Sequence, residues 1–184
     1  MENEKERAKR PRLGQIIKDE LMFDGVAFMQ NKSSQNARKS HTIENKLHFD
    51  MWMDKHYQIR YQHGDEFGKR EGIDPDRVLA LVEKSLKHLI IYSTHVRGFS
   101  FTKIDGSAID PQKTVLQEEI DGMVLNVVIK AHLIDIHTFE ITIITAMCVD
   151  DFRIFDGQYV IDIHGNTSTL LRKESKKMLE ICSI

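Results

Sequence analysis

The sequence predicts an α+β domain in which N-terminal helices pack on an antiparallel β-sheet meander. Residues 47–86 contain two segments with helical patterning, and the second begins with residues typical of a helix start. Residues 88–163 instead hold short runs rich in β-branched and aromatic residues. Polar connections without helical patterning separate these runs, which favours antiparallel pairing of consecutive strands.

Length and composition fit one domain with an extension. The chain has 184 residues, of which 41% are hydrophobic and 29% are charged, as in soluble globular proteins. Residues 1–45 are predicted to form a charged N-terminal extension. Within it, apolar residues at helical spacing indicate a short helix over 13–30, and residues 31–40 are predicted to be a polar loop. Residues 46–184 are predicted to form a single α+β domain.

Several cellular settings are disfavoured by the sequence. No run of eighteen apolar residues occurs, so no transmembrane helix and no membrane partner are expected. The charged N-terminus has no apolar segment of the kind found in secretory signals. Cys148 and Cys182 show neither the spacing of a metal site nor that of a disulfide framework. A cytoplasmic protein with reduced thiols is the simplest interpretation.

The first segment of the domain predicts a helix from Leu47 to about His63. Its residues fall on one helical face at offsets of 0, 3, 4, 7, 11 and 14, namely Phe49, Trp52, Met53, His56, Arg60 and His63. The face is apolar at first and then becomes polar without losing its phase. A helix of this kind would direct its polar residues toward the sheet and would end near the glycines that follow, Gly64, Gly68 and Gly72.

A second helix is predicted from Asp74 onward. Asp74 suits the N-cap position, Pro75 the first turn, and Asp76 the positive end of the helix dipole. The buried stripe consists of Val78, Leu79, Leu81, Val82 and Leu86. Strands are predicted after it at 88–93, 98–102, 114–120, 123–134, 139–148 and 158–163. Residues 167–181 are predicted to close the chain as a helix capped by Thr167 or Ser168.

The charge distribution argues against general nucleic-acid binding. The net charge is −2, and residues 105–162 carry eleven acidic against three basic side chains. A nonspecific duplex binder presents a broad basic face, which this chain lacks. The sequence offers at most a local basic patch.

Two short motifs open the domain and carry a family resemblance. His56 and Arg60 form a His-x-x-x-Arg pair, and Arg70 stands before Gly72 and Ile73 in "REGI" ahead of the acidic-capped helix. With the order of helices and then sheet, the chain resembles RelE-like and BrnT-like ribonuclease toxins over about residues 48–163. It differs from them by the insertion "YQHGDEFGK" between Arg60 and Arg70.

The resemblance implies a metal-independent endoribonuclease of toxin or RNA-processing type, without a cofactor. In such enzymes the 2′-hydroxyl of RNA attacks the adjacent phosphate, which requires proton transfer and cations around the phosphate. Histidine suits proton transfer and arginine suits bidentate phosphate binding. The candidate catalytic residues are His56, Arg60 and Arg70. The candidate substrate-binding residues are Lys69, His63, His137 and Ser168.

Structural interpretations stand beside each of these assignments. His56 and Arg60 fit a solvated helix face equally well, and Arg70 could pair with Glu66 or Asp74. His137 lies in a predicted hairpin tip, and Ser168 in a predicted helix cap. No metal motif occurs among the nine histidines, and no metal site is expected.

The alternative function is a noncatalytic interaction module, such as an antitoxin, immunity or phage-encoded inhibitor protein. The acidic sheet favours it, because acidic faces often block basic nucleic-acid-binding surfaces. RNA is the expected partner of the enzyme, and a target protein or antitoxin that of the module.

Overall fold

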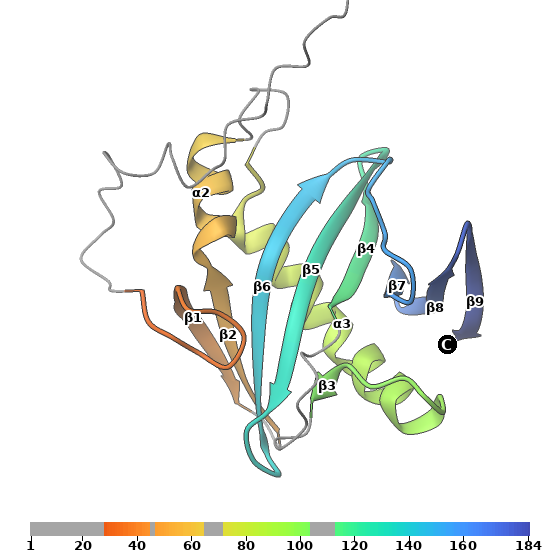
Figure 1. Cartoon of the computed structure of the whole chain (residues 1–184), viewed down its shortest axis with the longest axis horizontal. Helices are drawn as coiled ribbons and strands as arrows, with labels where there is room; N and C mark the ends of the chain where they lie inside the picture. Colours follow the sequence, from red (N-terminus) through yellow and green to blue (C-terminus); the bar gives the residue numbers. More distant parts are fainter. Residues whose placement is uncertain (1–27, 45–46, 65–71, 104–112) are drawn as a thin grey trace, which may run out of the picture.

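A single mixed β-sheet organises the protein in the computed structural model, which describes residues 28–44, 47–64, 72–103 and 113–184 (Figure 1). Within these ranges the sheet has nine strands: β1 (Ala37–Glu44), β2 (His48–Asp54), β3 (Thr102–Lys103), β4 (Thr114–Ile120), β5 (Met123–Leu133), β6 (Thr138–Cys148), β7 (Tyr159–His164), β8 (Thr167–Glu174) and β9 (Lys177–Ser183). The two helices of the described ranges are α2 (Lys55–His63) and α3 (Pro75–His95). None of the described helices is both long and apolar enough to cross a membrane.

The sheet is mostly antiparallel, and the predicted meander is present in part. The strand order is β1-β2-β6-β5-β4-β7-β8-β9, with β3 paired to β5. β4, β5 and β6 form an antiparallel meander, and so do β7, β8 and β9. Three pairs are parallel: β2 with β6, β4 with β7, and β3 with β5. Parallel β2–β6 pairing requires a crossover, and the chain between these strands contains α2, α3 and the strands β3, β4 and β5.

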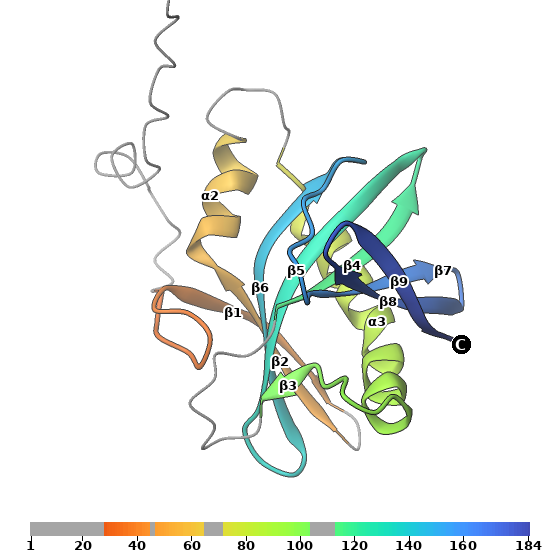
Figure 2. The same ribbon diagram turned by 45° about the vertical axis from the view of Figure 1, so that its right-hand side comes forward.

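α3 covers one face of the sheet, and both ribbon views show it crossing behind β5 and β4 (Figures 1 and 2). The main core lies between this helix and the sheet. It is made of side chains from α3 and from alternate positions of the strands, among them Leu89, Tyr92, Met51, Ile141, Leu125, Leu116 and Ile161. The opposite face carries a smaller apolar cluster of Val115, Val128 and Val160, against which Phe152 and Ile154 pack.

The predicted start of the second helix is confirmed. Asp74 is the N-cap of α3, its carboxylate accepts a hydrogen bond from the backbone N–H of Asp76 at 3.0 Å, and Pro75 occupies the first helical position. The helix then buries Val78, Leu81, Val82 and Leu86, four of the five residues predicted for its stripe.

We expect Asp74→Ala to lower the free energy of unfolding by about 1 kcal/mol, because a first-turn N–H loses its acceptor. Asp74→Asn is the matched control, since asparagine also caps helices, and it should cost much less. Chemical denaturation of both variants measures the difference. Equal losses would show that the charge of Asp74, and not its cap, stabilises α3.

The prediction of a strand over 88–93 is wrong, because this segment forms the last turns of α3. The buried positions of the helix continue through it, since Ser85, Leu89 and Tyr92 follow one another at steps of four and three residues. The β-branched and aromatic composition of 88–93 therefore does not decide its structure, because the segment continues the buried helical stripe of α3. Of the predicted strand over 98–102, only Thr102 is in a strand, as the first residue of β3.

The prediction of a helix from Leu47 is wrong for its first half. Residues His48–Asp54 form β2, and only Lys55–His63 are helical. In β2 the residues Phe49, Met51 and Met53 face the main core, while Trp52 points to the other face and is also buried. Burial on both faces gives an apolar run that imitates a helical face. The two predicted helices therefore do not open the domain, because the β1–β2 hairpin precedes them.

The prediction of a C-terminal helix is wrong as well. Thr167–Glu174 and Lys177–Ser183 form a hairpin, with a two-residue turn in which Ser175 has a φ of 53°. At the other end, residues 37–40 belong to β1 and not to the predicted loop. β1 pairs with β2, so the sheet begins before residue 46. Most of the helix predicted over 13–30 lies outside the described residues.

Candidate functional site

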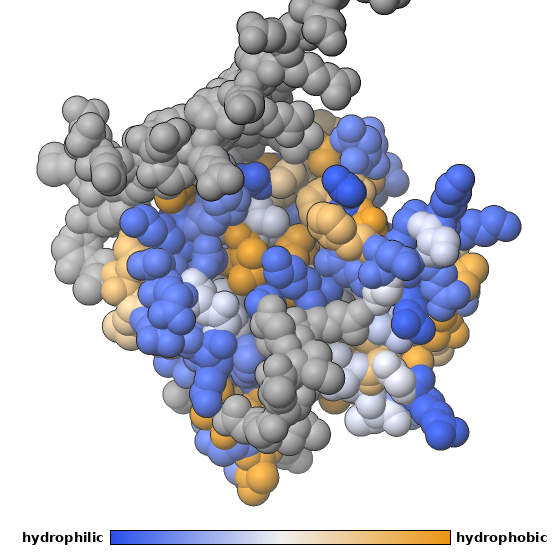
Figure 3. All heavy atoms as spheres, viewed as in Figure 1, coloured by the Kyte–Doolittle hydropathy of each residue, from blue (hydrophilic) through white to orange (hydrophobic). Residues whose placement is uncertain are grey.

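A cavity of about 530 Å³ lies on the face of the sheet opposite α3. Its walls come from α2, from the sheet at β5 and β6, and from the connection between β6 and β7. In Figure 3, which looks onto this face, apolar residues are exposed at the centre with hydrophilic residues around them. The cavity therefore combines an apolar floor with a polar rim.

α2 places His56 and Arg60 in this cavity, one helical turn apart. The helix begins there because Asp54 is its N-cap, with its carboxylate accepting a hydrogen bond from the backbone N–H of His56 at 2.8 Å. Arg60 then donates through Nη1 to the Thr145 hydroxyl on β6 at 2.9 Å. This bond joins α2 to the floor of the cavity and fixes the guanidinium against it.

The other side of α2 is anchored to the start of α3. The Tyr57 hydroxyl donates to the backbone carbonyl of Ile73 at 2.8 Å, and Tyr57 and Ile59 are buried. At Gly72 the backbones approach so closely that a Cβ atom would lie 2.2 Å from the carbonyl oxygen of Tyr61. Glycine is the residue that such an approach requires. With one face held in this way, α2 presents its other face to the cavity.

The charges around the cavity are mainly positive. Among the described residues that line it, Arg60, Lys113 and Arg153 are basic and Asp151 is the one acidic residue. Its apolar lining consists of Val128, Ile144, Met147, Val149, Phe152 and Phe155. A local positive field therefore exists within a β-region that is acidic as a whole, and it favours an anionic ligand with an apolar or aromatic part.

The remaining site residues proposed from the sequence do not line this cavity, or lie outside the described residues. Arg70 and Lys69 lie outside the described residues. His63 is exposed in the last turn of α2, and His137 is exposed in the turn between β5 and β6. Ser168 is buried, so neither phosphate contact nor helix capping describes it.

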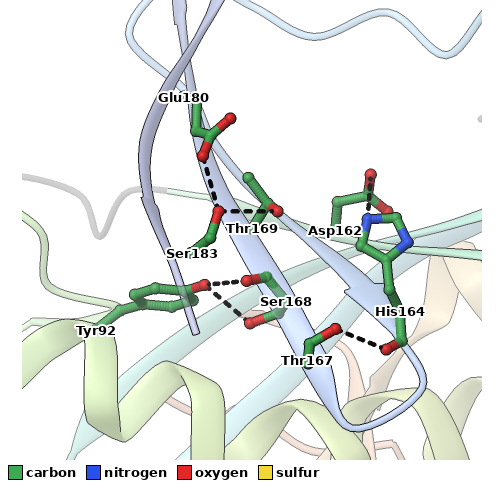
Figure 4. A network of polar contacts seen from close by, with 8 residues as sticks. All are labelled: Tyr92, Asp162, His164, Thr167, Ser168, Thr169, Glu180 and Ser183. Carbon is green, nitrogen blue, oxygen red and sulfur yellow. Dashed lines mark hydrogen bonds and ion pairs between the residues drawn. The ribbon is translucent and has the colours of Figure 1, made fainter.

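Ser168 belongs to a polar network in the core under α3. Its hydroxyl lies 2.9 Å from the Tyr92 hydroxyl and 2.8 Å from Nδ1 of His88, and Tyr92 also donates to the Ser168 carbonyl at 2.7 Å. Figure 4 shows Tyr92 pointing from α3 to Ser168 on β8. Burial lowers the pKa of His88, and nearby Lys87 and Lys84 lower it further. These contacts join β8 to α3 and give Ser168 a structural role.

Sequence reasoning missed Lys113, Thr145, Arg153 and Phe155 as cavity residues. One signal was present for the last two, since "DDFRIFDG" places Arg153 between two phenylalanines in a connection between strands. Thr145 carried no such signal, because only the pairing of distant elements brings it beside Arg60.

A second polar cluster lies on the same face, on β2, β5 and β6. Asp50 and Glu140 are register partners, and His132 is the partner of Glu140 on β5. His132 is buried. Burial alone would raise the pKa of Asp50, but hydrogen bonds from Lys39 and Thr42 outweigh this effect and lower it.

The pKa of Glu140 is shifted in the direction opposite to that of Asp50. Burial raises the pKa of its carboxyl above the ordinary value, and the negative charge of Asp50 acts in the same direction. The backbone N–H of Lys32 donates to the Glu140 carboxylate at 2.8 Å and offsets part of this shift. The folded protein therefore binds this proton more tightly than the unfolded chain does, so ionisation of Glu140 destabilises the fold as the pH rises.

We expect Glu140→Gln to raise the melting temperature at pH 7, because glutamine can still accept the Lys32 bond without carrying a charge. The gain should shrink as the pH falls from 7 into the acidic range in which Glu140 is protonated in the folded and the unfolded states alike. Thermal unfolding of wild type and variant across this range measures it, with the exposed Glu119→Gln as control. A gain that is constant with pH would exclude ionisation of Glu140 as its cause.

Among the described residues no group of three or more His, Cys, Asp or Glu side chains could hold a metal ion. Comparisons with protein-family models, with curated proteins and with solved structures find no match to this chain. The site therefore has to be interpreted from its own chemistry.

Proposed function

We propose that the protein is a metal-independent endoribonuclease of toxin or RNA-processing type, with its active site in the cavity between α2 and β6. The observation that carries this proposal is that His56 and Arg60 line the same cavity as Lys113 and Arg153. A group able to transfer protons thus lies among three cations. The resemblance of the two opening motifs to RelE-like and BrnT-like toxins supports the same reaction.

The proposed reaction is an attack of the RNA 2′-hydroxyl on its own 3′-phosphate. The 2′-oxygen forms a bond to phosphorus as it loses its proton, and the bond from phosphorus to the 5′-oxygen of the next nucleotide breaks as that oxygen gains a proton. His56 performs one of these proton transfers, a role that histidine fills in many enzymes. The products are a 2′,3′-cyclic phosphate and a free 5′-hydroxyl.

The cations have a separate role in this proposal. Negative charge accumulates on the phosphate oxygens during the attack, and donors already in place stabilise it without reorganisation. Arg60 suits this role because Thr145 fixes its guanidinium at the cavity floor. Lys113, directly before β4, and Arg153, in the β6–β7 connection, add further positive charge. Arg70 remains a predicted third catalytic residue on the strength of the resemblance alone.

The test is incubation of the purified protein with end-labelled single-stranded RNA in the presence of EDTA. We expect fragments that end in a 2′,3′-cyclic phosphate, and no cleavage of the same sequence made with 2′-O-methyl nucleotides. Intact RNA after prolonged incubation, or cleavage of the 2′-O-methyl strand, would contradict the proposal. Intact RNA would favour the interaction module instead.

A further inference from the structure

We infer that Phe155, with Arg153 beside it, is a stacking platform for an unpaired nucleobase, so that the cavity selects single-stranded nucleic acid without strong preference for base identity. This inference rests on the proposed function for its choice of ligand. It assigns a role to the β6–β7 connection that the cleavage reaction does not require.

The exposure of Phe155 is the first observation. Its side chain is 60% exposed, although it lines the cavity. Among the described phenylalanines it is the one that is exposed, since the others are buried or half-buried. Leaving an aromatic ring in water forgoes the free energy that its burial would release. A ring kept exposed at the rim of a cavity is therefore suited to contact a ligand.

The position of Arg153 is the second observation. Its guanidinium carbon lies 5.0 Å from the centre of the Phe155 ring, within the range of a cation–π contact. An aromatic ring supplies a flat surface for a base, and an adjacent guanidinium supplies charge for its phosphate. The pair thus offers the two contacts that a nucleotide needs, at the rim of a cavity that also contains Arg60 and Lys113.

The connection is held in shape without a ligand. The backbone N–H of Phe155 donates to the buried Gln158 side chain at 3.1 Å, and the N–H of Gln158 donates back to the Phe155 carbonyl at 3.1 Å. Gly157 donates to the carbonyl of Lys173 on β8 at 2.8 Å. Phe152 and Ile154 pack against the apolar cluster of the sheet. Because these contacts already order the backbone, binding does not have to offset the entropy of ordering a loop.

These features favour unpaired bases over duplexes. In a duplex both faces of each base are covered by its neighbours, whereas a base in a single strand can leave its neighbours and stack on an aromatic side chain. Stacking tolerates all four bases because each of them has a π-face. The described part of the cavity has only a few cations, which is consistent with local recognition of a strand and not with a broad duplex-binding surface.

The experiment measures binding and not cleavage. A fluorescently labelled 2′-O-methyl single strand lacks the attacking hydroxyl, so its binding can be followed by anisotropy with the intact protein. We expect Phe155→Leu to weaken binding by about 5- to 100-fold, the scale of losing one base stack. Phe155→Trp should keep wild-type affinity, because indole also stacks. Ile136→Ala is the control, since Ile136 is exposed in the turn between β5 and β6 and does not line the cavity.

Three results would overturn the inference: wild-type affinity in Phe155→Leu, duplex binding as tight as that of the single strand, or no binding of the single strand by the wild-type protein. Because the probe cannot be cut, each of these three binding results is independent of whether the protein cleaves RNA. Failure of the base platform can therefore be told apart from failure of the ribonuclease proposal. RNA that stays intact, together with a loss of affinity in Phe155→Leu, would contradict the enzyme and retain the base platform.

Discussion

Replacing His56 with alanine is expected to reduce RNA cleavage by about 100-fold or more, the usual scale for removing a general acid or base. The residue lies in the first turn of α2, and its backbone N–H, which the alanine variant keeps, donates to the Asp54 cap. The variant should therefore keep a melting temperature close to that of the wild type. Cleavage rates on a single-stranded RNA in EDTA, beside thermal unfolding of the same samples, measure both effects.

Matched variants separate chemistry from structure in this experiment. Arg60→Lys keeps the positive charge but loses the bidentate fork, so cleavage should fall while binding retains most of its dependence on salt. His95→Ala removes an exposed histidine at the end of α3 and should leave cleavage unchanged. Wild-type cleavage by His56→Ala would remove His56 from the mechanism. If His56→Ala loses stability, His56→Gln restores a polar side chain, and its cleavage rate decides the question.

The second large effect is expected from Leu89→Ala, which should lower the free energy of unfolding by about 2–5 kcal/mol. Leu89 has no exposed surface and lies in the main core between α3 and the sheet. Alanine keeps the helix propensity and removes the packing, so the loss reports burial alone. Denaturant unfolding monitored by circular dichroism measures it.

Ile91→Ala is the matched control, because the same β-rich run contains both positions. In a strand, residues 89 and 91 would face the same side and both changes would cost similar amounts. In α3 they face different directions, and the Ile91 side chain is 37% exposed, so its loss should change stability by about 0.5 kcal/mol or less. Similar losses for the two variants would contradict the helical assignment of this segment.

Features fixed by local chemistry could be predicted from the sequence. The start of α3 follows from Asp74 and Pro75, whose preferences act within one turn of the chain. The predicted strand at 114–120 coincides with β4, the predictions for β5 and β6 differ from the structure by one residue at one end, and that for β7 is shifted by one residue. In these strands β propensity and tertiary burial act in the same direction.

Features fixed by tertiary packing could not be predicted in the same way. β2 is buried on both faces, so its apolar spacing carries no strand period. The β8–β9 turn uses Ser175 at positive φ, where a glycine or asparagine would have signalled a hairpin. The shared location of His56 and Arg60 was proposed from helical phase, but half of the segment that supplied this phase is a strand. The two residues still share a face because α2 itself spans them.

The parallel pairing of β2 with β6 has a consequence for the order in which the protein assembles. Arg60 and Thr145 are 85 residues apart, and the strands that bring them together close the longest connection in the sheet. Hairpins such as β5–β6 and β8–β9 form by local contacts, whereas this closure must offset the entropy of a long loop. During synthesis α2 leaves the ribosome long before β6, which supplies the floor of the cavity. A nascent chain that has made His56 and Arg60 therefore holds no cavity until β6 and the connection after it have left the ribosome, so whatever the cavity does begins only after the β6–β7 connection has emerged.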